Sequence, residues 1–199
     1  MGTSQQFTFV SGGARSGKSA WAETQAINLA AEAGSRLVYI AAARADDAEM
    51  RRRVERHKAA RKDKGFETLE WHTDAGGAVS LLPPGCVVLL ECLGTLLANE
   101  MFGHKKTGGT DSQKMAPPDF FVQKIFGDIL SLRAHAAHLL VVSNDVFSDG
   151  VTYNEPTENY RRALGALHVK LAAISDLAVE CVCSVCSLHV RAHRSLIRR

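Results

Sequence analysis

The sequence lacks any apolar run near the ~20 residues needed to cross a bilayer, which argues against a membrane-spanning protein. Its first residues also lack the basic start and long apolar stretch of a secretory signal peptide. The net charge of +3 is too small to indicate a polyanionic partner such as nucleic acid. With 46% hydrophobic and 23% charged residues, the chain has ordinary globular composition. We therefore expect a cytoplasmic protein, whose 199 residues suit a single domain.

Cysteine is scarce and odd in number, which predicts reduced thiols in a cytosolic protein. Cys181, Cys183 and Cys186, with His189 and His193 nearby, could ligate a soft metal. The same run alternates like a strand, however, and neighbouring cysteines of a strand point to opposite faces. We therefore favour a strand packed with small apolar thiols. The five cysteines are Cys86, Cys92, Cys181, Cys183 and Cys186.

Short apolar segments alternate with helix-length segments along the chain. The apolar segments are nearly continuous and rich in Val, Leu and Ile, as strands covered on both faces must be. Strands that alternate with helices pair in parallel through right-handed crossovers. The sequence thus predicts an α/β fold with an open, mainly parallel sheet and helices on both faces. The predicted strands are residues 7–11, 37–41, 87–91, 139–143 and 177–183, and the predicted helices are residues 17–33, 46–62, 92–101, 118–138 and 155–175.

Two segments have loop composition. Residues 103–118 are rich in Gly, Lys, Thr and Ser, which predicts an irregular excursion. Residues 148–156 are rich in turn formers and follow the predicted strand at 139–143. Open α/β sheets place their ligand sites beyond such strand ends.

One motif carries a specific chemistry. Residues 12–19 match G-x-x-x-x-G-K-[ST] in full, with a predicted strand before them and a helical pattern after them. Its glycines let backbone N–H groups turn toward phosphate oxygens, and the helix N-terminus adds partial positive charge. Lys18 would reach the β/γ-phosphates, and the Ser19 hydroxyl would ligate Mg²⁺. The alternative is an ordinary glycine-rich turn. The predicted phosphate cradle comprises Gly12, Gly13, Ala14, Arg15, Ser16, Gly17, Lys18 and Ser19.

A phosphate loop needs a second acidic group for Mg²⁺, usually at the end of a neighbouring strand. Glu91 ends the apolar strand predicted at 87–91. A carboxylate there is costly unless it meets a cation or several donors, so we predict that Glu91 is a Mg²⁺ ligand. The alternative is that it caps the following helix.

The helix predicted at 46–62 carries an unusual histidine. Met50, Val54, His57 and Arg61 share one helical face, and Lys58 adds positive charge beside them. One interpretation is a solvated basic helix with an incidental histidine. The other is a histidine nucleophile or acid/base group surrounded by cations that bind a triphosphate. The spacing alone does not choose between the two interpretations.

These motifs, in this order, resemble the bifunctional adenosylcobinamide kinase / adenosylcobinamide-phosphate guanylyltransferase family of cobalamin biosynthesis. The likeness covers nearly the whole chain. The chain departs from the family pattern at Ala42 and Ala43, where hydroxyl side chains are usual, at His168, which replaces an asparagine, and at Ser184–Cys186, which replaces Gly-Ile-Pro. The matching residues are 12–19, 39–41, 47, 49–50, 57–58, 65–70, 89–93, 98–100, 142–145, 150–151 and 155.

The resemblance implies two activities. The first phosphorylates adenosylcobinamide with ATP or GTP, and the second transfers GMP from GTP through His57 to give adenosylcobinamide-GDP. It also implies a RecA-like P-loop core, Mg²⁺, catalytic roles for His57 and Lys18, and a homo-oligomer, the family form being a trimer. Further nucleotide-contacting positions implied by the resemblance are Ala41, Ala42, Ala43, Lys58, Ala59, Ala60, Arg61, Glu70 and Glu91.

Two other functions remain open at this point. One is a P-loop kinase of another small hydroxylated substrate, in which His57 has no chemical role. The other is a nucleotide-binding regulatory protein without turnover, which the intact Lys18, Ser19 and Glu91 argue against. The basic helix lacks the interleaved aromatic residues of a nucleic-acid surface.

Overall fold

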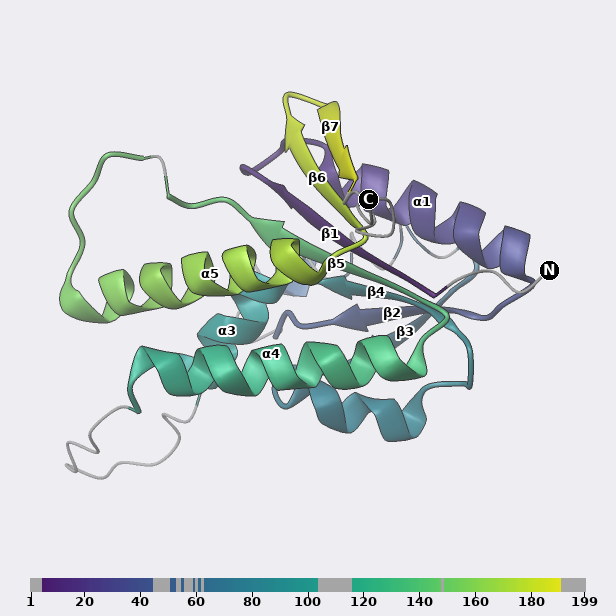
Figure 1. Ribbon diagram of the computed structural model, residues 1–199, viewed down its shortest axis with the longest axis horizontal. Helices are drawn as coiled ribbons and strands as arrows, with labels where there is room; N and C mark the ends of the chain where they lie inside the picture. The colour runs from purple at the N-terminus through teal and green to yellow at the C-terminus, as the bar shows by residue number, and fades with distance from the viewer. Residues whose placement is uncertain are drawn as a thin grey trace, which may run out of the picture.

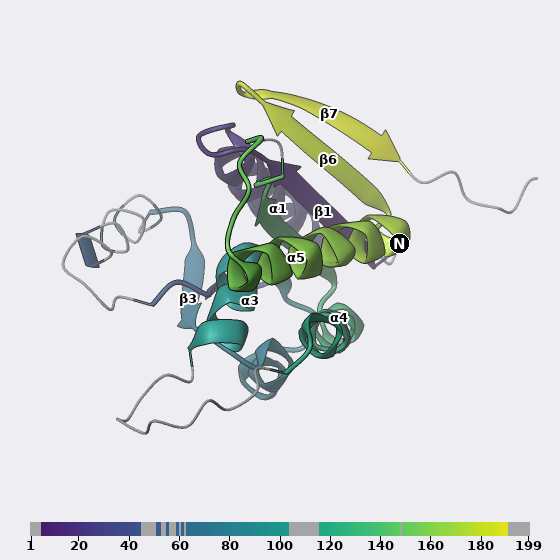
Figure 2. The same ribbon diagram turned by 90° about the vertical axis from the view of Figure 1, so that its left-hand side faces the viewer.

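The fold is built on one seven-stranded sheet. A computed structural model describes residues 5–44, 51–52, 55, 59, 61, 63–103, 116–147 and 149–190. The strands are β1 (Gln6–Gly12), β2 (Leu37–Ala41), β3 (Phe66–Glu70), β4 (Val87–Glu91), β5 (His138–Asn144), β6 (Leu177–Val182) and β7 (Val185–Val190). Their order is β3-β2-β4-β5-β1-β6-β7, and every neighbouring pair is parallel except β6–β7. The predicted open, mainly parallel sheet is confirmed, with β3 at one edge and the β6–β7 hairpin at the other (Figure 2).

Helices cover both faces of this sheet, as predicted. Helix α1 lies on one face, whereas α3, α4 and α5 lie on the other (Figure 1). Within the described residues, no helix is both long and apolar enough to span a bilayer. In the helix predicted at 46–62, the described residues 51, 52, 55, 59 and 61 are helical. The elements are α1 (Lys18–Ala33), α3 (Leu93–Phe102), α4 (Pro118–His135), α5 (Glu155–Ile174) and a 3-10 helix, η1 (Ala75–Leu81).

The central strands are buried on both faces, which explains their continuous apolar sequences. In β4, Val87 and Leu89 pack in the cluster beneath α1, whereas Val88 and Leu90 pack in the cluster beneath α3, α4 and α5. Helix α1 contributes small side chains such as Ala22 to its cluster, which lets its backbone approach the sheet closely. This packing fixes the strand ends that carry the candidate site.

Some element boundaries differ from those predicted. Helix α4 ends at His135, because Ala136 is extended and the Ala137 N–H donates a hydrogen bond to the Cys86 carbonyl, which starts β5 at His138. The strands β3 and β7 and the helix η1 were not predicted. Both strands lie at edges of the sheet and expose most of their residues, so neither has the apolar run of a buried strand.

The prediction of reduced cysteines is wrong for two of the five. Cys181 and Cys186 lie directly opposite each other in the β6–β7 hairpin and form a disulfide. The strand predicted to reach residue 183 ends at Val182, because Cys183 and Ser184 both have positive φ, at 48° and 66°, and make the two-residue turn. The disulfide also occupies two of the thiols that a metal site would have used.

The central position of Leu89 makes it a test of the packing described here. We expect Leu89→Ala to lower the free energy of unfolding by roughly 2–5 kcal/mol, because the side chain is fully buried and its loss leaves a cavity. Leu81→Ala is the matched control, since Leu81 is 59% exposed and should change stability by less than about 0.5 kcal/mol. Urea unfolding of both variants measures the difference, and equal losses would contradict the packing.

Candidate nucleotide-binding site

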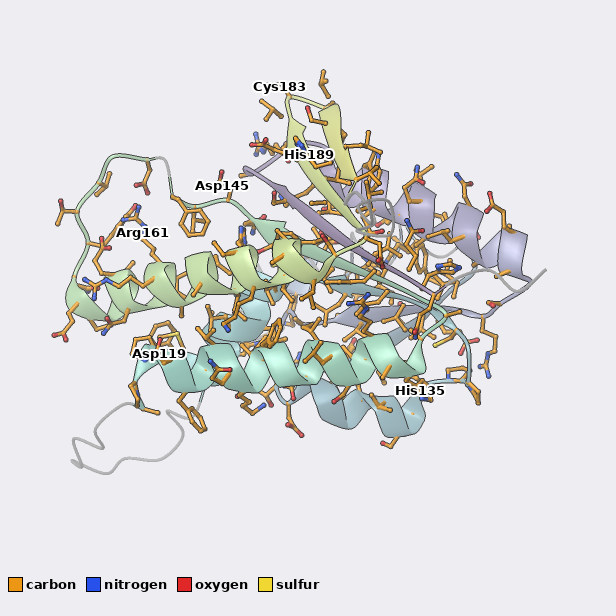
Figure 3. The ribbon with its side chains drawn as sticks, viewed as in Figure 1. Asp119, His135, Asp145, Arg161, Cys183 and His189 are labelled. Atoms are coloured by element: carbon orange, nitrogen blue, oxygen red, sulfur yellow. A yellow bond between two sulfur atoms is a disulfide. The ribbon has the colours of Figure 1, made fainter. Side chains whose placement is uncertain are left out.

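The predicted site residues gather at the carboxyl edge of the sheet. In the strand registers Gly12 lies beside Asn144, and Ala41 lies between Glu70 and Glu91. Asp145, labelled in Figure 3 just beyond the end of β5, donates its N–H to the Gly12 carbonyl at 2.8 Å. Strands β1, β2, β3 and β4 thus deliver their predicted residues to one edge, where open α/β sheets bind ligands.

The phosphate loop connects β1 to α1, as predicted. Arg15 and Gly17 have positive φ, at 58° and 89°, and the N–H of Ser16 between them donates to the Gly13 carbonyl. Residues in the left-handed conformation turn successive N–H groups to one side, which makes a concave anion site. The Lys18 ammonium donates to the Gly13 carbonyl at 2.9 Å, so this side chain lies across the loop where a phosphate would meet it.

The β6–β7 hairpin supports the loop from behind. A Cβ on Gly12 would lie 2.4 Å from the Cys181 carbonyl oxygen, and one on Gly17 would lie 3.0 Å from Ser184 Cα. The Ser184 N–H donates to the Ser16 carbonyl at 2.9 Å. A cavity of about 200 Å³ lies between the loop and the hairpin. Gly12 and Gly17 are therefore needed for close contact with the hairpin as well as for backbone freedom.

The Ser19 hydroxyl and the Glu91 carboxylate meet directly. Ser19 Oγ donates to Glu91 Oε1 at 2.5 Å, and the Tyr39 hydroxyl donates to Glu91 Oε2 at 2.9 Å. The alternative role of Glu91 as a helix cap is wrong, because Cys92 is the N-cap of α3 and its sulfur accepts the Thr95 N–H. A hydroxyl and a carboxylate beside a phosphate loop are oxygen ligands of the type that Mg²⁺ takes. These residues fit the predicted metal.

The segment after β2 is held by its backbone. The Ala42 N–H donates to the Glu91 carbonyl at 3.0 Å, and the Ala42 carbonyl accepts from Asn99 Nδ2 at 2.8 Å. Asn99 donates also to the His72 carbonyl, at 2.9 Å, which joins the loops that follow β2 and β3. Ala42 is fully buried, whereas Ala41 and Ala43 are half-buried. The alanines that replace hydroxyl residues of the family thus present backbone groups at this edge.

Arg61 is buried beside the same carboxylate. Its guanidinium lies 3.6 Å from the centroid of the Tyr39 ring, and the residue is 4% exposed. Its Nε and Nη1 have no hydrogen-bond partner among the described residues. Burial is also the main reason that the pKa of Tyr39 is raised above its usual range, and the Glu91 charge raises this pKa further. Arg61 is therefore packed against the site, unlike a residue of a solvated helix face.

Three of the predicted residues cannot be placed. His57, Lys58 and Ala60 lie outside the described residues. Ala59 is exposed on the same helical segment. Glu70 is exposed at the end of β3.

Comparison with known proteins identifies the family. The family described as cobinamide kinase / cobinamide phosphate guanyltransferase matches residues 8–188. This chain belongs to that family. Every described residue of the candidate site lies within the matched segment.

Curated relatives agree with this assignment. The chain is 32% identical to the bifunctional adenosylcobalamin biosynthesis protein CobU of Escherichia coli, over 84% of this chain and 90% of that protein. It is 31% identical to the CobU protein of Salmonella typhimurium, with the same coverage. It is 32% identical to the bifunctional adenosylcobalamin biosynthesis protein CobP of Pseudomonas aeruginosa, over 81% of this chain and 84% of that protein.

Among solved structures, the chain is similar to the ATPase domain of a helicase. The TM-score is 0.47 and the sequence identity is 13%, over 88% of this chain and 69% of that one.

Sequence reasoning missed Tyr39 and Asn99 as parts of this family's site in the chain. Both stood within segments that match the family, but neither had been given a role. A signal was present for Tyr39, because a tyrosine inside a buried strand needs a partner for its hydroxyl. The sequence does not say which strand lies beside β2, and the partner Glu91 belongs to that neighbour.

The loop glycines give a matched pair of substitutions. We expect Gly12→Ala to weaken ATP binding at least tenfold, because its new Cβ would lie 2.4 Å from a backbone oxygen of the hairpin and the loop must shift. Gly13→Ala should bind ATP almost as the unmodified protein does, because nothing lies within 4 Å of its new Cβ. Titration with a fluorescent ATP analogue compares the two, and equal affinities would contradict the role given to the hairpin.

Proposed function

We propose that this chain is a bifunctional adenosylcobinamide kinase and adenosylcobinamide-phosphate guanylyltransferase of cobalamin biosynthesis. Its membership of the family over residues 8–188 supports the choice of substrate. The observation that carries the proposal is the contact of Ser19 with Glu91 at the end of the phosphate loop, beside Lys18. This arrangement suits the transfer of a phosphoryl group, which requires positioning and neutralisation of charge above all.

In the kinase step, the phosphate loop holds the triphosphate of ATP or GTP. Backbone N–H groups of residues 13–19 bind the phosphate oxygens, and Lys18 neutralises charge on the β/γ-phosphates. Ser19 and Glu91 would hold Mg²⁺, which supplies further neutralisation of the phosphate charge when bound. The substrate hydroxyl oxygen bonds to the γ-phosphorus, the bond from this phosphorus to the bridging oxygen breaks, and the nucleoside diphosphate leaves.

In the guanylyltransferase step, His57 is the proposed nucleophile. A ring nitrogen of neutral His57 bonds to the α-phosphorus of GTP, and the bond to the departing pyrophosphate breaks. A phosphate oxygen of adenosylcobinamide phosphate then displaces His57 and gives adenosylcobinamide-GDP. Cations such as Lys58 and Arg61 favour neutral over protonated histidine and stabilise the pyrophosphate. The burial of Arg61 beside Glu91 supports a shared location for both steps.

The proposal extends to the nucleotide contacts and to the assembly. Ala41, Ala42, Ala43 and Glu70 lie at the edge where the phosphate loop begins, which supports contacts with nucleotide there. We place the enzyme in the cytoplasm, as a homo-oligomer and specifically a trimer, built from single-domain chains. The exposed apolar residues of the β6–β7 hairpin support association between copies. They are Val182, Val185, Leu188 and Val190.

Covalent labelling tests the guanylyltransferase step. The protein is incubated with Mg²⁺ and α-³²P-GTP, and we expect a label on protein that is acid-labile and alkali-stable, because the bond joins phosphorus to nitrogen. Adenosylcobinamide phosphate should discharge the label. His57→Ala should abolish the label and retain adenosylcobinamide phosphorylation.

The matched control for this experiment is His189→Ala, since His189 is an exposed histidine of β7. This variant should label normally. If the unmodified protein phosphorylates adenosylcobinamide but takes no label from GTP, the guanylyltransferase half of the proposal is wrong and a kinase alone remains.

A further inference from the structure

Both oxygens of the Glu91 carboxylate accept a hydrogen bond, and the two donors come from different elements. Ser19, at the start of α1, donates to Oε1 at 2.5 Å. Tyr39, in the middle of β2, donates to Oε2 at 2.9 Å. Because β2 and β4 are neighbours in the sheet, the Tyr39 hydroxyl reaches the carboxylate from within the protein rather than from the loop.

The two donors differ in what they can do once a cation is bound. Ser19 is itself a proposed metal ligand, and a hydroxyl oxygen that binds a cation turns its proton away from it. Tyr39 has no such second role. It is a protonated donor at neutral pH, and a hydrogen bond from a neighbouring group is what fixes the orientation of a metal-binding carboxylate.

The Tyr39 ring is itself held in place by two neighbours. The Arg61 guanidinium stacks at 3.6 Å from the ring centroid, and the edge of Phe66 in β3 meets the ring at 5.9 Å between centroids. Tyr39 is 4% exposed and Arg61 is equally buried, so neither side chain has room to leave this position without disturbing the other. A buried guanidinium on an aromatic face is a strong form of this contact.

We propose that Tyr39 is a positioning residue that holds the Glu91 carboxylate in the orientation required for Mg²⁺, and that the stacked Arg61 locks Tyr39 in place. The inference rests on the proposed function for the identity of the metal. It adds a hydrogen-bonded group behind the carboxylate and a link from the basic helical segment to the metal position. Loss of such a supporting group costs about 10–100-fold in metal affinity or activity in other metal sites.

Metal binding measured without turnover tests the role of Tyr39. Binding of Mn²⁺ to the complex of full-length protein with a non-hydrolysable ATP analogue is followed by electron paramagnetic resonance. We expect Tyr39→Phe to weaken Mn²⁺ binding about 10–100-fold, because it removes the hydroxyl and leaves the ring in its stack. In the kinase assay, the Mg²⁺ concentration for half-maximal rate should rise by the same factor, with kcat nearly unchanged at saturating Mg²⁺.

Tyr160→Phe is the matched control. Tyr160 is also largely buried and donates its hydroxyl to a backbone carbonyl, that of Gly94 at 3.2 Å. Its variant loses one buried hydrogen bond away from Glu91 and should bind Mn²⁺ as the unmodified protein does. If Tyr39→Phe and Tyr160→Phe bind Mn²⁺ equally well, the positioning role is wrong.

The part played by Arg61 requires a double-mutant cycle. Arg61→Met removes the charge and the planar group, and we expect weaker Mn²⁺ binding than in the unmodified protein. If Arg61 acts through Tyr39, the effect of Arg61→Met should shrink when Tyr39 is already phenylalanine. Fully additive effects on Mn²⁺ affinity would overturn the lock.

The outcomes also separate this inference from the proposed function. If the unmodified protein binds Mn²⁺ with the analogue and Tyr39→Phe binds it weakly, the positioning role stands even when adenosylcobinamide is not phosphorylated. If adenosylcobinamide is phosphorylated and Tyr39→Phe leaves metal dependence unchanged, the proposed function stands and the positioning role falls. An unmodified protein that binds no Mn²⁺ with the analogue overturns the positioning role.

Discussion

The hydrogen bond between Ser19 and Glu91 is the interaction on which the functional account depends. It joins the first turn of α1 to the end of β4, and so brings the last residue of the phosphate loop to an acidic group more than seventy positions away in sequence. A carboxylate at the end of an apolar strand would be costly without such donors. In this protein the donors are the groups that a metal-bound triphosphate would require.

The phosphate loop depends in turn on the opposite edge of the sheet. The β6–β7 hairpin presents the Cys181 carbonyl to Gly12 and the Ser184 N–H to the Ser16 carbonyl. The disulfide from Cys181 to Cys186 ties the two strands of the hairpin together behind the loop. A motif that is local in sequence is therefore completed by residues from the C-terminal part of the sheet.

The sequence was informative where the determinants are local or where burial is complete. The phosphate loop and the five buried strands could be predicted because each has its own motif or apolar run. The edge strands β3 and β7 could not, since one-sided burial leaves a mixed sequence. The contact between Tyr39 and Glu91 depends on the order of strands in the sheet. The stacking of Arg61 on Tyr39 depends on what the helical face meets, and helical spacing shows only that such a face exists.

The central claim is that Glu91 and Ser19 together form the metal position of a triphosphate site. Calorimetric titration with ATP, with and without Mg²⁺, tests it most directly in Glu91→Gln, with Glu70→Gln as the exposed control from the same edge. The account predicts that Mg²⁺ strengthens ATP binding in the unmodified protein and in Glu70→Gln, and that this gain is lost in Glu91→Gln. A Glu91→Gln variant that keeps the full effect of Mg²⁺ would contradict it.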